Sequence, residues 1–221
     1  MFNDYYGKYK NLLRLDEREN VSTNLVISEN KQFFNDSFND SLFYQIVLIN
    51  DVEFEAIVKQ EKKSEDKKLV LRPDTEISVG SVVSVNNSSY LAIDFLNEGI
   101  NEIYPTATLK LCNSIFPIPG EITKVLIGTD PKTGRPIYDE QVTYTSEPCI
   151  VESQYSKSSE VNQFKVPEGT LVISMKYQTS EKLKIDYEFE MYGSKYKVAN
   201  FDYTGVIGEK GIMKIIAEKV V

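Results

Sequence analysis

The chain has 221 residues, of which 41% are hydrophobic and 26% charged, and its formal net charge is −8 at pH 7. This composition is typical of a globular protein and excludes extended disorder, while the acidic balance argues against tight nucleic-acid binding, which depends on lysine and arginine at the phosphates. No apolar run approaches the roughly 20 residues of a membrane-spanning helix and the N-terminus lacks the apolar core of a signal peptide, so we expect a protein made in a cytoplasm, with no membrane partner.

Residues 1–41 form the first predicted segment, which is helical. Apolar and aromatic residues recur at helical spacing and predict helices over about 3–14 and 17–37, the second opening with charged residues. The aromatic face of these helices comprises Phe2, Tyr5, Tyr6, Tyr9, Phe33, Phe34 and Phe38. This face must be buried, either on the following β domain, which is the usual fate, or on a neighbouring subunit.

Residues 42–113 predict a small antiparallel β-barrel. Apolar residues alternate at Phe54, Ala56 and Val58, and a meander of three strands follows in residues 77–111. About five short strands per unit favour a barrel, because closing the sheet removes its unpaired edges. The charged residues 61–68 predict a solvated hairpin tip.

Residues 114–147 are predicted to be a linker that carries a long β-hairpin. The turn formers of residues 128–136 lie between the apolar residues 125–127 and 137–138. We therefore expect the tip of this hairpin to project beyond the barrels.

Residues 148–221 predict a second β-barrel that repeats the first. Residues 183–217 align with residues 77–111 without a gap, and the aligned pairs include Tyr90 with Tyr196, Phe95 with Phe201 and Gly99 with Gly205. We interpret the match as a duplication, although strand alternation alone makes any two meanders look alike. The tyrosines are expected in the cores with their hydroxyls at the rim, and the glycines are expected to supply positive φ between strands.

The predicted fold is therefore mainly β, with an N-terminal helical segment and two tandem small antiparallel barrels joined by a projecting hairpin. Both cysteines, Cys112 and Cys149, are expected to be buried thiols and could be neighbours in space. With no histidine in the chain, they cannot complete an ordinary structural zinc site.

The residues give little sign of catalysis. The absence of histidine excludes the common triads and zinc helices, and no phosphate loop, dinucleotide fingerprint or calcium loop is present, so we expect no cofactor. What remains is carboxylate chemistry, for which Glu53 with Glu55 and Glu188 with Glu190 lie two apart on predicted strands. Since the chain has 33 acidic residues, such pairs arise by chance, and we do not expect an enzyme.

Several stretches together resemble a known group of proteins. They are the tyrosine-rich DYYGKYKNLL, the charged DERENV, the barrel stretch VGSVVSVNNSSYLAI, and a Cys-Asn end followed by PCIV. This plan resembles structural proteins of tailed bacteriophages of Gram-positive bacteria, in the head–tail connector group. The chain departs from that group in having Ser81 where an acidic residue is usual, Tyr90 where tryptophan is frequent, and a longer linker.

The resemblance implies a virion protein that forms a homo-oligomeric ring in the phage neck, as a head-closure (stopper) or adaptor-like subunit assembled in the host bacterial cytoplasm. Its partners would be the portal or adaptor protein and the tail proteins, and DNA would pass without specific binding. Candidate contacts with neighbouring subunits or the channel are Thr129, Asp130, Lys132, Arg135, Phe2, Tyr5, Tyr6 and Tyr9, and the loops near the paired tyrosines and glycines could line the ring interface. Alternatives are a capsid decoration or tail-completion protein, or a carboxylate hydrolase of cell-wall glycan.

Overall fold

The computed structural model describes residues 26–61, 65–153 and 169–220. A helix runs through residues 26–37 and leads into a 3-10 turn, η1 (Phe38–Asp40). The first unit contains β1 (Tyr44–Ile49), β2 (Val52–Gln60), β3 (Lys67–Leu71), β4 (Val82–Val85), β5 (Ser88–Leu96), η2 (Gly99–Glu102) and β6 (Thr106–Leu111). The second contains β7 (Ser114–Thr129), β8 (Pro136–Ser153), β9 (Leu171–Lys176), β10 (Glu188–Met191), β11 (Ser194–Ile207) and β12 (Lys210–Lys219).

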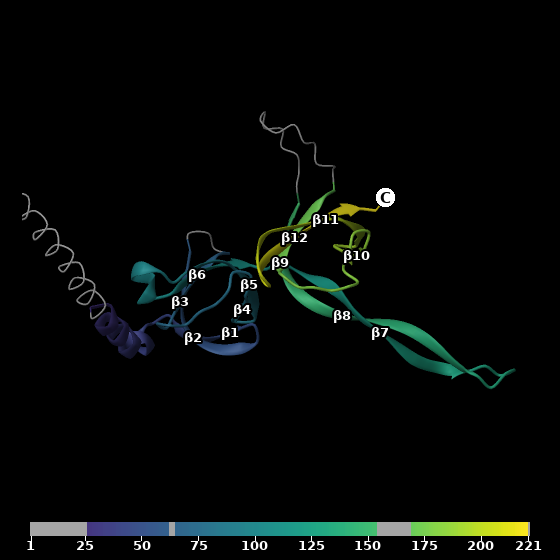
Figure 1. The fold of residues 1–221 in the computed structure, drawn as a ribbon, viewed down its shortest axis with the longest axis horizontal. Helices are drawn as coiled ribbons and strands as arrows, with labels where there is room; N and C mark the ends of the chain where they lie inside the picture. Colours follow the sequence, from purple (N-terminus) through teal and green to yellow (C-terminus); the bar gives the residue numbers. More distant parts are fainter. Residues whose placement is uncertain (1–25, 62–64, 154–168, 221) are drawn as a thin grey trace, which may run out of the picture.

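The two units lie side by side, with the helix at the far end of the first and the β7–β8 hairpin extending from the second (Figure 1). The prediction of a mainly β chain with an N-terminal helical segment is confirmed, and the part of the second predicted helix that the structure describes is helical. No helix in the described residues has the length and apolar character needed to cross a membrane.

The first unit is a closed antiparallel barrel, in which the strands of the described residues follow the order β1-β2-β3-β6-β5-β4. Pairing of Leu48 with Ser84 and of Ile49 with Val83 closes it. Asn86 and Asn87 connect β4 to β5 with φ of 49° and 64°, and Tyr192 and Gly193 connect β10 to β11 with φ of 51° and 70°. Two consecutive positive φ values are the type I′ geometry that matches the twist of a hairpin, so both units turn in the same way.

The second unit repeats the first strand for strand. Its order is β10-β11-β12-β9-β8-β7, which is the barrel order with β4, β5, β6, β3, β2 and β1 replaced by their counterparts. When the strands are matched through their pairing registers, the buried core residues of the barrel correspond to buried residues of the second unit as follows: Val47 to Phe116, Ile49 to Ile118, Ala56 to Cys149, Val58 to Val151, Leu69 to Ile173, Leu71 to Met175, Val83 to Phe189, Val85 to Met191, Tyr90 to Tyr196, Ala92 to Val198, Ala107 to Ile215 and Leu109 to Ala217. The equivalence of order and core supports a duplication.

The second unit is an open sheet where the pattern predicted a second closed barrel: β7 and β10 do not pair within the described residues. In the barrel, Asn50 N–H donates to the carbonyl of Val82 (2.8 Å), so the residues that face β4 with their backbone groups are Asn50 and Leu48. Their counterparts are Pro119 and Pro117, which have no N–H to donate.

Larger side chains hold the same two strands apart. Val47 and Val83 of the barrel are replaced by Phe116 and Phe189, whose rings meet edge to face with centroids 4.9 Å apart. The missing donors and this aromatic pair together explain the open seam between β7 and β10.

The ungapped match of residues 77–111 with 183–217 fails by two residues in the third strand. Ala92 pairs with Leu109 while Val198 pairs with Ala217, so the counterpart of Leu109 is Ala217 and not Ile215. A shift of two leaves every side chain on the same face, which is why alternation concealed it.

The two aligned glycines are consequently not equivalent. Gly99 begins η2, whereas Gly205 lies inside β11 opposite Ile212. The prediction that Gly205 supplies positive φ between strands is wrong, because its φ lies outside the left-handed region.

The helix packs on the barrel through its aromatic residues. Phe34 and Phe38 meet edge to face at 5.5 Å, and Phe38 is buried with Ile57 and Val70 of the barrel wall. Arg72 lies over the Phe38 ring with its guanidinium carbon 4.6 Å from the ring centroid. The described part of the predicted aromatic face is therefore buried on the β domain of the same chain. Phe33 is the exception among the described residues, because it is 73% exposed.

The two units also contact each other directly. Strands β5 and β8 touch, and Leu91 and Ile150 on these strands are buried although they belong to neither core. Lys176 Nζ donates to Asn50 Oδ1 (2.9 Å), and Lys110 Nζ lies 2.5 Å from Glu152 Oε1. These contacts join the barrel and the sheet into one framework.

Candidate functional site

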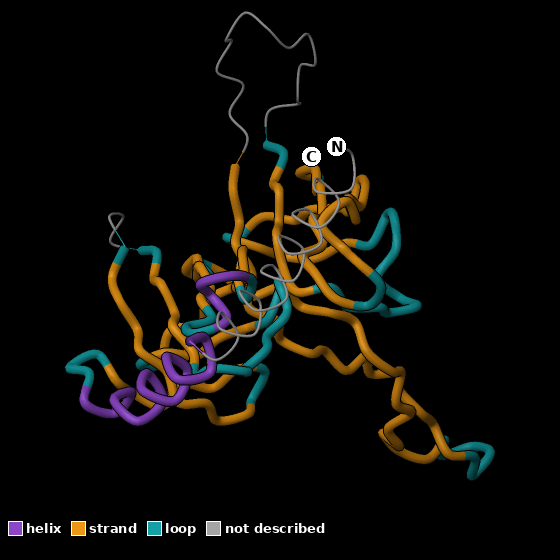
Figure 2. Tube along the Cα trace, turned by 60° about the vertical axis from the view of Figure 1, so that its left-hand side comes forward, coloured by secondary structure: helices purple, strands orange, loops and turns teal. Residues whose placement is uncertain are grey.

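The most prominent feature of the second unit is the β7–β8 hairpin. Its base belongs to the sheet, because β8 also pairs with β9 from Cys149 to Ser153. Beyond Pro119 the two strands pair only with each other among the described residues, and the ribbon runs out from the sheet (Figures 1 and 2). The segment that we predicted to be a linker thus supplies two strands of the second unit as well as a projection.

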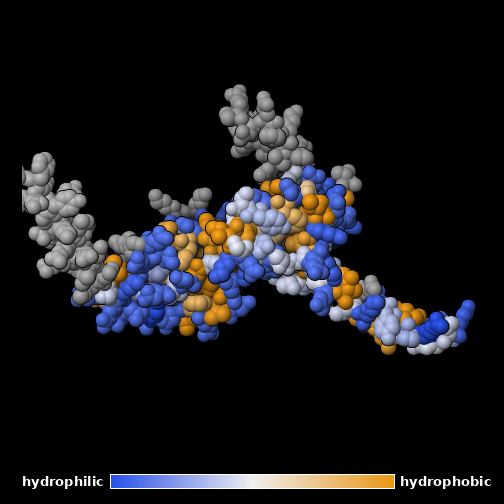
Figure 3. Space-filling model, viewed as in Figure 1, coloured by the Kyte–Doolittle hydropathy of each residue, from blue (hydrophilic) through white to orange (hydrophobic). Residues whose placement is uncertain are grey.

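The hairpin carries apolar side chains into solvent. Ile122 opposes Val142, and Leu126 opposes Tyr138, so these four side chains share one face of the ribbon. Leu126 and Tyr138 are 57% and 55% exposed, and Figure 3 shows hydrophobic surface along the projection. We call these four residues the apolar stripe.

The tip of the hairpin is held by one aspartate. The Asp130 carboxylate accepts hydrogen bonds from the Thr133 hydroxyl (2.7 Å) and the Lys132 N–H (2.8 Å), and Asp130 N–H donates to the carbonyl of Arg135 (2.8 Å). The bond from the Thr133 hydroxyl, and after it the bond from the Lys132 N–H, lowers the pKa of the Asp130 carboxyl. Thr129, Lys132 and Arg135 are exposed, so the predicted contact residues at the tip are accessible.

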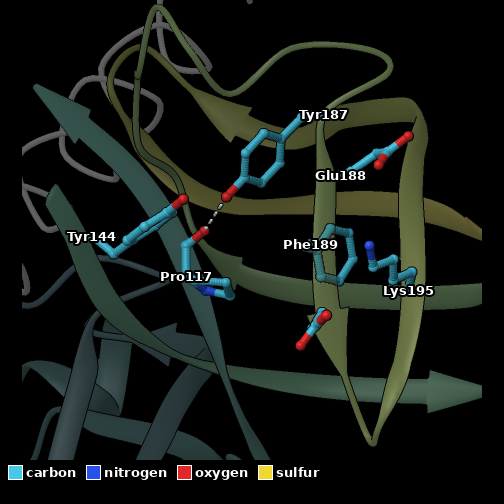
Figure 4. Close-up of a pocket in the computed structure, with 7 residues that line it drawn as sticks. Pro117, Tyr144, Tyr187, Glu188, Phe189 and Lys195 are labelled. Carbon is cyan, nitrogen blue, oxygen red and sulfur yellow. Dashed lines mark hydrogen bonds between the residues drawn. The ribbon is translucent and has the colours of Figure 1, made fainter. Parts of the chain in front are cut away.

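The open seam between β7 and β10 forms a cavity of about 390 Å³ (Figure 4). It is lined by Pro117, Tyr144, Tyr187, Glu188, Phe189, Glu190 and Lys195. The Tyr187 hydroxyl donates to the carbonyl of Pro117 (3.2 Å), and burial raises the pKa of Tyr187 to about 12, so it remains a donor. Sequence reasoning missed this seam, although Pro117 and Pro119, two residues apart in a strand pattern, were its signal.

The two carboxylate pairs have different surroundings. Glu55 forms an ion pair with Arg72 and accepts a hydrogen bond from the Tyr44 hydroxyl (2.9 Å), which makes it part of the contact between the helix and the barrel. The Arg72 guanidinium holds the pKa of Glu55 below its ordinary value. Glu188 and Glu190 are exposed at the seam cavity, beside aromatic side chains.

The remaining predicted residues fall in three groups. Tyr90 and Tyr196 are buried, and Phe95 and Phe201 pack at the edges of the two cores. Phe2, Tyr5, Tyr6 and Tyr9, like the first predicted helix, lie outside the described residues. Cys112 and Cys149 are free thiols whose pKa burial raises to about 12, and in the described part of the chain no group of three or more acidic or cysteine side chains is placed to hold a metal ion.

Comparison with known proteins follows the division into two units. The YomX N-terminal domain matches residues 11–111, and the YomX C-terminal domain matches residues 117–218. The SPbeta prophage-derived protein YomX of Bacillus subtilis (strain 168) is 30% identical over 179 residues, which are 79% of this chain and 82% of the relative. No solved structure matches the chain. The break between the two matched domains falls where the barrel ends and β7 begins.

Proposed function

Because this chain belongs to the YomX family of phage-derived proteins, we propose that it is a structural subunit of a phage particle. In this proposal the subunits form a ring in the neck, between the portal or its adaptor and the tail, and help to close the DNA channel. The particle is assembled in the cytoplasm of the host bacterium.

One observation carries the proposal: the hairpin exposes its apolar stripe on a ribbon to which no third strand of the described residues is added. An isolated two-stranded ribbon is at best marginally stable in water. Exposed apolar side chains gathered on one face, here with Lys124 between the two pairs, mark a surface for another protein. Binding by neighbouring subunits would stabilise the ribbon and cover the apolar stripe. The rigid barrel behind it, with the helix docked on the wall, supplies a second surface for the portal or the tail.

The charge of the chain is compatible with a channel for DNA. A net charge of −8 gives no general attraction to phosphates, so a ring built from such subunits would let DNA slide. This supports passage of DNA without specific binding.

The proposal is tested by the mass of the purified protein in solution and by its copy number in purified particles. We expect a ring of about six or about twelve copies, the closed rotational symmetries common in such assemblies. Removing residues 128–136, or changing Leu126 and Tyr138 to Ser, is expected to prevent assembly. Ile46→Ser is the matched control, because Ile46 is 61% exposed but lies on the barrel. Assembly and DNA retention that survive both hairpin changes would refute the role of the hairpin.

A capsid decoration or tail-completion protein is the nearest alternative. Decoration predicts a copy number far above that of a ring, so the same count in particles decides between the two.

The seam cavity favours one candidate of another class. Glu188 and Glu190 lie on one strand face beside Tyr144 and Tyr187, an arrangement of carboxylates and aromatic rings that could bind glycan. If the protein were a cell-wall hydrolase, it would release fragments from cell-wall glycan, and Glu188→Gln with Glu190→Gln would abolish the release. We expect no release from the unaltered protein.

A further inference from the structure

The edge of β4 that pairs with β1 in the barrel corresponds to an edge of β10 that no strand of the described residues pairs with. In the barrel, β4 pairs with β5 on one side and with β1 on the other. Its counterpart β10 pairs with β11 and, within the described residues, has no partner on its second edge. By the equivalence of Val82 and Ser84 with Glu188 and Glu190, the backbone groups of these two glutamates point into the seam.

The chain's own β7 cannot fill this site. Pro117 and Pro119 offer no N–H to β10, and their carbonyls already accept hydrogen bonds from the hydroxyls of Tyr187 (3.2 Å) and Ser180 (2.8 Å). The carbonyl of Gly120 accepts a bond from Lys182 Nζ (2.7 Å) in the same way. One edge of the seam is therefore blocked, while the edge formed by β10 has no strand partner among the residues that the structure describes.

We propose that the free edge of β10 accepts residues 122–126 of β7 from a second copy of this chain as an added strand. This inference rests on the proposed function, because it names the surface that receives the hairpin of the neighbouring subunit. Strand addition of this kind gains affinity from backbone hydrogen bonds and specificity from alternate side chains.

The alternation of residues 122–126 fits the seam. In a strand beside β10, side chains alternate between the solvent side, where Glu188 and Glu190 lie, and the cavity beside Phe189 and Tyr187. With Lys124 on the solvent side, its ammonium group lies across from the two carboxylates. Ile122 and Leu126 share that side with it, and Thr123 and Val125 face the aromatic cavity. Opposite charges facing each other across two strands stabilise the pair.

The other strand of the hairpin fits less well. In β8 the corresponding stretch carries Asp139 close to Tyr138, and an acidic side chain next to Glu188 and Glu190 repels them. Charge thus selects β7 over β8 as the added strand. In this arrangement β7 pairs with β10 through its edge that faces away from β8.

The contact is heterologous, since each copy gives its hairpin and receives another. Such contacts close into a ring when the rotation between copies allows it and otherwise build a filament.

Charge reversal tests the proposal. Glu188→Lys with Glu190→Lys is expected to weaken self-association by about tenfold, measured as the concentration at which assembly is half complete. The reason is that the two new lysines would face Lys124 of the added strand as well as Lys197 and Lys195, which lie opposite them on β11. Adding Lys124→Glu to these changes restores association. The matched control is Glu53→Lys with Glu98→Lys, which changes the net charge equally on the barrel and leaves association as it was.

Cross-linking tests the register. One copy carrying Glu190→Cys is mixed with another carrying Lys124→Cys, and we expect a disulfide-linked heterodimer under mild oxidation that is lost when Lys124→Cys is replaced by Glu98→Cys.

If association survives the reversal at Glu188 and Glu190 but not the removal of residues 128–136, the seam proposal is refuted and the proposed function stands. A protein that remains monomeric at every concentration, or association insensitive to both changes, refutes the two together.

Discussion

At the scale of single residues, a pair of glycines fixes how the two units meet. A Cβ built on Gly80 would lie 2.0 Å from the carbonyl oxygen of Gly211, so the two backbones approach more closely than any side chain allows. Gly80 N–H donates to Ala92 of the barrel (2.7 Å), while Tyr177 N–H donates to Gly211 in the sheet (2.9 Å). Each glycine is thus tied to its own unit, and their contact sets the placement of one unit on the other.

We expect Gly80→Ala to lower the free energy of unfolding by about 2 kcal/mol or more, since φ at this position is +86° and the added methyl group meets backbone. Urea unfolding followed by circular dichroism measures the change. Gly128→Ala is the control, because a Cβ there meets nothing within 4 Å in the described part of the chain, and it should stay within about 0.5 kcal/mol of the parent. Equal midpoints for the two variants would contradict the role of the glycine contact.

Asp130 makes the hairpin tip sensitive to acid. Its pKa in the folded tip is lowered from the ordinary 3.8, so the tip is stabilised above that value and loses this contribution as the pH falls through the folded pKa. We expect the amide resonances of Lys132 and Thr133 to be constant from neutral pH to about pH 4 and to shift below it. Thr133→Val removes the largest cause of the shift and should move the midpoint upward towards 3.8. A midpoint unchanged in this variant would show that the hydroxyl bond does not form.

At the scale of elements, one strand decides between a barrel and an open sheet. Strands β1 and β7 have the same place in the order, but β1 reaches β4 while β7 stops short of β10. The alternation of apolar residues is the same in both, so it predicted two barrels. The difference lies in the backbone donors of β7 and in the size of Phe116 and Phe189, neither of which changes the period of the pattern.

Leu48→Pro is expected to open the barrel as the counterpart Pro117 opens the sheet. The substitution removes a ladder donor between β1 and β4, and proline is confined to edge strands and bulges because it cannot make this hydrogen bond. Hydrogen exchange measures the result: the amide of Ser84, the partner of Leu48, should lose its protection while those of β2 and β3 keep theirs. Leu48→Ala keeps the N–H and serves as the control. Protection of Ser84 in both variants would mean that closure does not depend on this donor.

At the scale of the whole molecule, periodic patterns predicted the two units, the hairpin turns and the buried tyrosines. They could not reveal how the units sit against each other, because Leu91 and Ile150 look like ordinary core residues and the glycine contact has no period. They also could not separate the base of the hairpin from a linker, since pairing of β8 with β9 joins strands that lie on either side of residues 154–168 in the sequence. The same holds for the candidate site. The turn formers of residues 128–136 predicted the hairpin tip, but the seam could not be predicted without knowing which strands face each other.

The charge balance along the hairpin argues against binding of DNA. The projection carries three basic residues, Lys124, Lys132 and Arg135, and four acidic ones, Glu121, Asp130, Asp139 and Glu140. The whole chain has 33 acidic residues against 25 basic ones. We therefore expect no retention of duplex DNA in a gel at about 50 mM salt, because counterion release requires a cluster with an excess of cations over carboxylates. Glu121→Lys with Asp139→Lys creates that cluster and should produce retention that disappears as the salt concentration rises. Retention by the unaltered protein, or none by the variant, would mean that features other than hairpin charge control the interaction with DNA.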